Sequence, residues 1–423
     1  MSNRTSILFL GHTGQKRTFE DLLMYSDSTM TFKFINIHDY VNLGLQTLDK
    51  VDKSIYVDRY ATSSVQHGLL PSEIDKKNQL LFIKKLQFAT EKIIEEILQI
   101  SPDLVLLEKN NYVGKSVSKE LDKANILNGI FFPLRYDNNF MYFECHMLNK
   151  PFEINLNNSV NIFKNEIDYV KQHRTDSGAI RFLDKGKKYK QTFDYRLTLL
   201  NRSFGSRLLG FLLRFLAKYE FDKIKSEVGE GIYFYLHHQP EVALEDCRQD
   251  WYNQISKVEE LRMHLPLNLP LYVKESPSMF YRRSLEDYQR LHRLPNTFLV
   301  DNNSSTSSVL EKAKLIITVS GTIALESVSN GVPVIMFHNT WFSECPGIKV
   351  FSSISEIKDI NDIDKFNKKD SKNYLINLAK KISFEGRTLF LGRENTSQKD
   401  FVNYIKAITE LVNSKKINFN EPS

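Results

Sequence analysis

The chain has 423 residues, which exceeds one ordinary hydrophobic core and suits two domains. Hydrophobic residues make up 41% and charged residues 26% of the sequence, a balance typical of a soluble globular protein. The formal net charge of +6 is too small to indicate nucleic-acid binding, so we expect no nucleic-acid partner, although it suits anionic ligands or an anionic membrane surface.

The cysteines and the N-terminal residues indicate a cytoplasmic protein. Cys145, Cys247 and Cys345 form no CxxC pair and are odd in number, so we expect neither a disulfide framework nor a structural zinc site. The first apolar run stops at Gly11, which predicts a strand rather than a signal peptide. No stretch reaches the roughly 18 apolar residues of a membrane span.

The first part of the chain alternates predicted strands and helices. Residues 7–11 and 31–37 are typical of strands, and residues 76–99 carry apolar side chains at helical spacing. Residues 101–108 contain a continuous apolar run, as in a parallel strand buried on both faces, and residues 125–135 again pass from a helix end through glycine to a strand. This alternation predicts right-handed βαβ units and a parallel sheet.

The middle of the chain differs, and the second half resumes the α/β alternation. Residues 155–230 lack clear strands and predict helices and a linker, with a strongly apolar helix at 206–225. Further on, the apolar patterns predict strands at 231–239, 270–277, 297–302, 314–321 and 332–338, and helices at 251–265, 322–331 and about 396–414.

Four segments follow from this pattern. We predict an N-terminal Rossmann-like domain at 1–185 and a helical linker at 186–229. A C-terminal Rossmann-like domain is predicted at 230–385, and a C-terminal helix within 386–423 is predicted to pack back across the domain boundary. Two open α/β domains in tandem create a cleft between the carboxyl ends of their sheets, where ligands bind.

The clearest functional signal is Ser320-Gly321-Thr322, where a buried strand runs directly into a helix. The first turn of a helix has unpaired N–H groups at the positive end of its dipole, and Gly321 lets a phosphate approach the backbone. Glu326 follows a little over one turn later and could bind a ribose diol. An N-capped helix with a solvated Glu326 is the plainer alternative, but it leaves the following buried strand at 332–338 unexplained.

The same segment carries a resemblance to a known family. SGTIALE (320–326) followed by GVPVI (331–335) resembles the donor-site segment of GT-B glycosyltransferases. YFYLHHQPE (233–241) and LYVKESPS (271–278) stand upstream in the order and spacing of the bacterial capsule polysaccharide synthesis family, which contains Kdo transferases. The resemblance covers about residues 230–342 and implies a GT-B fold, in which two Rossmann-like domains with parallel sheets face a central cleft.

By this resemblance the nucleotide-sugar donor binds the C-terminal domain. The residues implied to bind it are His237, His238, Gln239, Glu241, Lys274, Ser320, Gly321, Thr322 and Glu326. Lys274 would face the donor phosphates, where a cation is needed in the absence of a metal. Adjacent histidines point to opposite sides of an extended chain, so at most one should reach the ligand. Either histidine could instead be structural, and Lys274-Glu275 could be an ordinary surface pair.

The N-terminal domain is predicted to bind the acceptor and to supply catalytic groups. His12 lies in the loop Gly11–Gly14 after the first strand, and Glu108 ends the buried run at 101–108. Sugar transfer needs a base for the acceptor hydroxyl or a carboxylate nucleophile, so His12 and Glu108 are the predicted catalytic residues. A simple tight turn and a carboxylate that caps the next loop are the respective alternatives.

These patterns predict a metal-independent glycosyltransferase of capsule or lipopolysaccharide-type synthesis. No DxD pair stands at a strand end to bind a metal. We expect no cofactor besides the nucleotide-sugar donor. The family resemblance implies CMP-Kdo as the donor and a glycan or glycolipid as the acceptor. Two alternatives remain: a non-hydrolysing nucleotide-sugar epimerase of the same fold, and a non-catalytic nucleotide-binding assembly subunit.

The apolar helix at 206–225 predicts a peripheral contact with the inner membrane. Its leucine and phenylalanine residues are flanked by Arg207, Arg214, Lys218 and Lys223, and such a helix can lie in the headgroup layer of an anionic bilayer. A helix so apolar on nearly all sides could instead be buried between the two domains.

Overall fold

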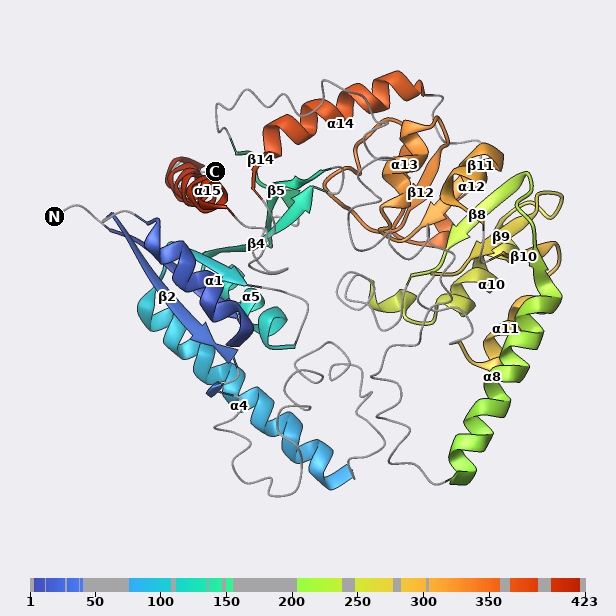
Figure 1. Ribbon diagram of the computed structural model, residues 1–423, viewed down its shortest axis with the longest axis horizontal. Coiled ribbons are helices and arrows are strands. Elements are labelled where there is room, and N and C mark those ends of the chain that lie inside the picture. Colours follow the sequence, from blue (N-terminus) through green and yellow to red (C-terminus); the bar gives the residue numbers. More distant parts are fainter. Residues whose placement is uncertain are drawn as a thin grey trace. The chain divides into compact units, whose positions relative to one another are not determined.

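The computed structural model describes residues 4–11, 13–26, 29–37, 39–40, 76–107, 112–134, 137–146, 150–154, 204–237, 248–276, 283–301, 304–357, 366–386 and 397–418. The chain forms two compact units, Met1–Lys164 together with Asn377–Ser423, and Asn165–Ile376. Each unit contains one seven-stranded sheet with helices packed on it (Figure 1). None of the helices in the described ranges is long and apolar enough to cross a membrane.

The sheet of the first unit has a parallel core with antiparallel strands at one side. Its order is β14-β5-β4-β3-β1-β2, with β6 paired to β5. Strands β2, β1, β3 and β4 are parallel to one another, whereas β5 pairs antiparallel with β4, β6 and β14. The strands are β1 (Thr5–Gly11), β2 (Met30–Asn36), β3 (Leu104–Leu107), β4 (Leu127–Leu134), β5 (Asp137–Cys145), β6 (Lys150–Pro151) and β14 (Ser383–Glu385).

Alternating residues of these strands face two different helical layers. Ile7 and Phe9 of β1 belong to a core with α1 (Thr13–Met24) and α15 (Gln398–Asn418). Leu8 and Leu10 belong to a second core with α4 (Lys76–Ile100) and α5 (Tyr112–Lys123). This division explains why β3 is apolar throughout and β1 is apolar from Ile7 to Leu10, because both faces of a sheet between helical layers are buried.

The sheet of the second unit is parallel at every pairing. Its order is β13-β12-β11-β8-β9-β10-β7. The strands are β7 (Lys225–Ser226), β8 (Gly231–Tyr235), β9 (Leu271–Lys274), β10 (Thr297–Val300), β11 (Ala313–Thr318), β12 (Val334–Met336) and β13 (Ile348–Val350). The helices are α8 (Phe204–Ile224), α10 (Gln254–His264), α11 (Leu285–His292), α12 (Thr306–Lys312) and α13 (Ile323–Ser329), with short 3-10 turns at Gln249–Trp251 and Ile354–Glu356. Helix α14 (Lys368–Ile382) begins in this unit and continues past Ile376 into the first one.

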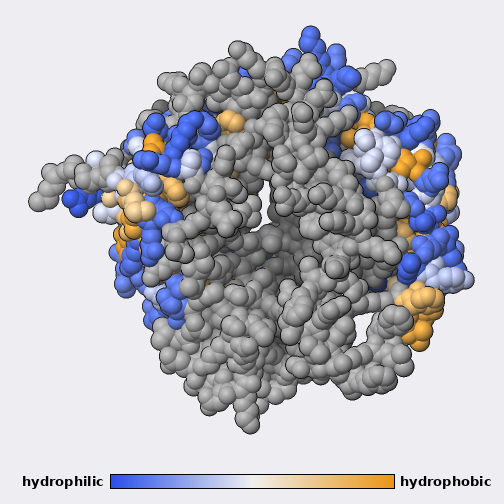
Figure 2. All heavy atoms as spheres, viewed as in Figure 1, coloured by the Kyte–Doolittle hydropathy of each residue, from blue (hydrophilic) through white to orange (hydrophobic). Residues whose placement is uncertain are grey.

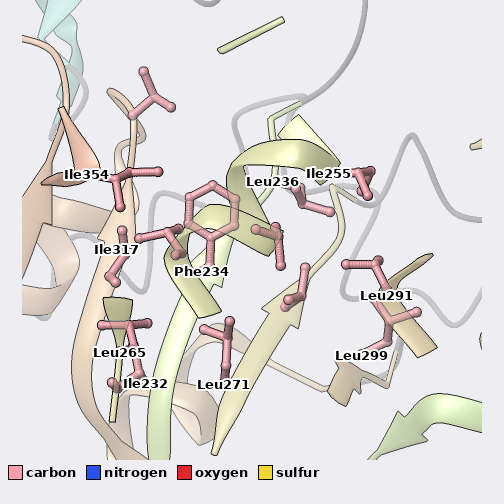
Figure 3. Packing of buried hydrophobic residues seen from close by; sticks show 14 of the residues in the cluster. Ile232, Phe234, Leu236, Ile255, Leu265, Leu271, Leu291, Leu299, Ile317 and Ile354 are labelled. Carbon is pink, nitrogen blue, oxygen red and sulfur yellow. The ribbon is translucent and has the colours of Figure 1, made fainter. Parts of the chain in front are cut away.

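One hydrophobic cluster joins the strands of this sheet to α8, α10 and α11. It includes Ile232 and Phe234 of β8, Leu271 of β9, Leu299 of β10 and Ile317 of β11, all almost fully buried (Figure 3). Burial at this scale favours the folded unit by about 25 cal/mol for each Å² of apolar surface removed from water. The rigid sheet therefore fixes where each loop leaves its strand.

The α/β class is confirmed, with a parallel sheet in the second unit and a mixed sheet with a parallel core in the first. The predicted strands and helices of both halves are present with bounds shifted by a few residues. The predicted arrangement of the two sheets about a central cleft stays a prediction. The described helix of the predicted linker, α8, contributes Ala217, Phe221 and Ile224 to the core of the second unit. Within the predicted C-terminal segment, α15 contributes Phe401 and Tyr404 to the core of the first unit.

Two of the three cysteines lie in the part of the chain that the structure describes. Cys145 and Cys345 are buried free thiols. Burial raises the pKa of Cys345 to about 12, so this thiol stays protonated and unreactive at neutral pH. Cys247 lies outside the described residues.

Candidate functional site

The second sheet reverses its strand order between β8 and β11. From β8 the chain adds β9 and β10 on one side and then returns to add β11, β12 and β13 on the other side. The loops after β8 and β11 therefore leave the carboxyl edge in opposite directions, and open α/β sheets bind their ligands in the crevice that results. His237 follows β8 and Ser320 follows β11, so both predicted donor residues stand at this switch point.

The structure brings the imidazole of His237 onto the loop after β11. The Nε2 atom of His237 lies 3.3 Å from Oγ1 of Thr318 and 3.5 Å from the backbone nitrogen of Ser320. Thr318 is fully buried as the last residue of β11. His237 thus contacts the predicted donor loop, although it lies about 80 residues earlier in the chain, after β8.

Gly321 occupies a position with no room for a side chain. Its backbone N–H donates to Oγ1 of Thr318 at 3.2 Å, and a Cβ at position 321 would stand 2.7 Å from the same oxygen. The close approach of this loop to the strand end therefore requires glycine, independently of any ligand. A phosphate could use the same absence of a side chain to reach the backbone.

Thr322 and Glu326 belong to the start of α13. Thr322 is the N-cap residue but forms no side-chain cap hydrogen bond, so the plainer alternative of a hydroxyl-capped helix does not describe Thr322. Glu326 is half-buried in the first turn, where the helix dipole favours a negative charge. The roles of both residues in binding a donor stay predictions.

Lys274 and Glu275 are both buried at the end of β9, so the alternative of an ordinary surface pair is wrong. Lys274 is 8% exposed and its Nζ donates to the carbonyl of Ser304 at 2.9 Å. Burial lowers the pKa of Lys274 to about 8, while the Asp301 carboxylate partly opposes the shift. An ammonium that is poorly solvated by water gains more from an anionic ligand than an exposed one does.

Glu275 forms its ion pair with Arg283 rather than with Lys274. The Arg283 guanidinium donates to both carboxylate oxygens, from Nε at 2.5 Å and from Nη2 at 3.0 Å. Burial raises the pKa of Glu275, and the Arg283 charge opposes that shift. The Ser276 backbone N–H also donates to Glu275, at 3.0 Å.

Five of the predicted site residues are not among the described residues. His238, Gln239 and Glu241 lie outside the described residues, as do the predicted catalytic residues His12 and Glu108. Strand β1 precedes His12 and strand β3 precedes Glu108 in the chain. The two strands are parallel neighbours, with Leu10 opposite Leu107. In the described ranges no group of three or more His, Cys, Asp or Glu side chains could hold a metal ion.

Sequence reasoning missed three residues that contact the site. Gln254, Arg283 and Thr318 all bond to His237 or to the loop after β11. Thr318 could have been found, because it ends the strand that leads into Ser320. Gln254 and Arg283 begin or precede helices distant in sequence, and no local pattern marks them.

Comparison with known proteins gives distant structural likenesses only. No protein-family model matches the chain, and no curated protein matches it in sequence. Among solved structures, it is similar to the UDP-GlcNAc 2-epimerase of Neisseria meningitidis bound to UDP-GlcNAc, at 14% identity and a TM-score of 0.28, with 97% of this chain and 100% of that chain covered.

The chain is also similar to two structures of KpsC from Thermosulfurimonas dismutans. The beta Kdo 2,7 transferase has 9% identity and a TM-score of 0.39, with 97% of this chain and 100% of that chain covered. The beta Kdo 2,4 transferase has 11% identity and a TM-score of 0.32, with coverage of 72% and 87%. At identities of 9–14% and TM-scores of 0.28–0.39, nothing about the reaction of this chain follows from these likenesses.

Proposed function

We propose that the chain is a metal-independent glycosyltransferase whose second unit binds a nucleotide-sugar donor at the carboxyl ends of β8, β9 and β11. The observation that carries the proposal is the contact of His237 with Thr318 and Ser320 at the point where strand order reverses. Lys274 stands on β9, the other neighbour of β8, and adds a poorly solvated cation suited to the donor phosphates.

The proposed donor sugar is Kdo, carried by CMP, and the proposed acceptor is a glycan or glycolipid of capsule or lipopolysaccharide-type synthesis. Both rest on the resemblance of residues 230–342 to the capsule polysaccharide synthesis family. The proposed catalytic residues are Glu108 and His12, which follow adjacent strands of the first sheet. A carboxylate there could deprotonate the acceptor hydroxyl or attack the donor sugar.

We further propose that the protein works at the cytoplasmic face of the inner membrane, which α8 contacts. The inner side of α8 packs into the core through Ala217, Phe221 and Ile224. On its outer side Leu212, Phe215 and Tyr219 are 50%, 61% and 56% exposed, and Figure 2 shows hydrophobic surface where Figure 1 places α8. Exposed apolar residues at helical spacing beside Lys218 suit the headgroup layer of an anionic bilayer.

A ligand screen followed by a product assay tests the proposal. Thermal shifts with CMP, UDP, GDP and ADP should single out one nucleotide, and Glu326→Ala should weaken its binding by about 1.5–3 kcal/mol if the carboxylate holds the ribose. Incubation with CMP-Kdo should then yield a glycoside only when an acceptor glycan is added. Conversion of a UDP-sugar without any acceptor would instead establish the epimerase. Binding without turnover on any acceptor would establish an assembly subunit.

A further inference from the structure

The backbone of His237 is held by the side chain of Gln254. The His237 N–H donates to Oε1 of Gln254 at 2.7 Å, and Nε2 of Gln254 donates to the His237 carbonyl at 3.1 Å. Gln254 is 1% exposed and is the first residue of α10, whose N-cap Asn253 accepts from the Ser256 backbone N–H. The capped start of α10 therefore holds the side-chain amide of Gln254 in place, and this amide in turn holds the backbone of His237.

A buried ion pair supports the same carbonyl. Nη2 of Arg283 donates to the His237 carbonyl at 3.3 Å while the same guanidinium binds Glu275. Arg283 directly precedes Ser284, which begins α11 through a capping box with Asp287. Buried ion pairs add little net stability because desolvation offsets the attraction, but a bidentate pair permits only one geometry.

The contacts of the imidazole bear on which ring nitrogen carries the proton. The Ser320 backbone N–H can only donate, so Nε2 of His237 accepts in this contact, which a neutral ring allows when its proton lies on Nδ1. Thr318 Oγ1 accepts from the Gly321 N–H and lies 3.3 Å from Nε2 of His237, to which its own O–H can donate. A continuous chain of hydrogen bonds thus runs from Gln254 through His237 to the backbone of Ser320 and Gly321.

We infer that Gln254, Thr318 and the Arg283–Glu275 pair are positioning residues that set the shape of the donor loop through His237. The inference rests on the proposed function, because it assumes that the loop Ser320–Thr322 binds the nucleotide. In this arrangement the residues need not touch the donor. They hold the loop in one conformation before the donor binds. The donor therefore loses no binding free energy to ordering the loop.

Matched substitutions separate positioning from general stability. Thr318→Val removes the hydroxyl with little change of shape, and Gln254→Leu removes the amide; nucleotide affinity should fall about tenfold in each. Thr90→Val and Asn403→Leu are the controls, since Thr90 and Asn403 are buried in the first unit and donate to backbone carbonyls at 2.8 Å. Both controls should bind nucleotide like the wild type even if their thermal midpoints fall.

Two variants of His237 test the role of Nε2 itself. His237→Gln places an amide where Nε2 was, so this variant should retain most of the nucleotide affinity. His237→Asn places its amide where Nδ1 was, so this variant should lose nucleotide affinity. Ring-¹⁵N spectra of the histidines, with the His237 signal assigned from its loss in His237→Gln, should show Nδ1 protonated and Nε2 unprotonated. Thr318→Val should shift the Nε2 signal even without nucleotide.

The outcomes distinguish this inference from the proposed function. If CMP and UDP bind the wild type and bind Thr318→Val and Gln254→Leu equally well, the positioning role is overturned and the donor site stands. A proton on Nε2 of His237 would likewise overturn the inference. If none of CMP, UDP, GDP and ADP binds the wild type, the proposed function fails and the positioning role fails with it.

Discussion

Replacing Lys274 with methionine tests the buried cation at the end of β9. The ammonium is 8% exposed, and burial lowers its pKa from 10.5 to about 8 against the opposing charge of Asp301. Because the folded-state pKa lies below the unfolded one, the folded chain holds fewer protons between pH 8 and pH 10.5, and stability rises with pH across this window. A pKa displacement of this size corresponds to about 3 kcal/mol.

Urea unfolding at neutral pH and at pH 10.5 measures the effect. The free energy of unfolding of the wild type should gain about 3 kcal/mol relative to Lys274→Met over this range. At neutral pH Lys274→Met should be more stable than the wild type, because it no longer buries a charged ammonium. Loss of the hydrogen bond to the Ser304 carbonyl should reduce this gain in the free energy of unfolding by about 1 kcal/mol.

Lys314→Met is the matched control, because Lys314 is exposed and lies 3.5 Å from Glu230; this variant should follow the wild-type pH curve. Nucleotide affinity should change in the opposite direction to stability, falling in Lys274→Met and staying constant in Lys314→Met. A stability difference between wild type and Lys274→Met that does not change with pH would refute the reasoning.

Three further predictions concern the donor loop, the acceptor domain and the membrane. Gly321→Ala should weaken nucleotide binding in calorimetry by about 1.5–3 kcal/mol, because its Cβ meets Thr318 Oγ1 at 2.7 Å, and unchanged affinity would remove this loop from the site. Glu108→Gln should abolish transfer with nucleotide affinity nearly unchanged; near-normal turnover would make Glu108 structural. The wild type should sediment with anionic liposomes at low salt and the double variant Arg214→Glu/Lys218→Glu should not, whereas no sedimentation of the wild type would refute the membrane contact.

The sequence predicted the longer parallel strands and missed β5, β6 and β14, as well as the short parallel strands β7 and β13. Buried parallel strands such as Leu104–Leu107 are continuous apolar runs between helices, which is a strong local signal. Strand β5 carries no such signal, since Asp137–Cys145 mixes polar and apolar residues. Strand β14 has three residues and pairs with β5 from more than 200 residues away, so only tertiary contacts define it.

The candidate site was predictable where it lies at strand ends. Ser320 and His237 follow buried strands, and the position of both at the carboxyl edge follows from the α/β pattern. Their contact with each other depends on β8 and β11 being neighbours, which the order of elements along the chain does not specify. Gln254 and Arg283 reach His237 across 17 and 46 residues, so their part in the site appears only in three dimensions.

The central claim is that the second unit binds a nucleotide at the loop after β11. Calorimetric titration of CMP into the wild type and Gly321→Val tests it most directly, with UDP, GDP and ADP titrated in parallel. We expect one of these nucleotides to bind the wild type at a single site and to lose most of its affinity in Gly321→Val, whose larger side chain would displace Thr318. Binding of none of the four nucleotides, or equal binding by both proteins, would contradict the account.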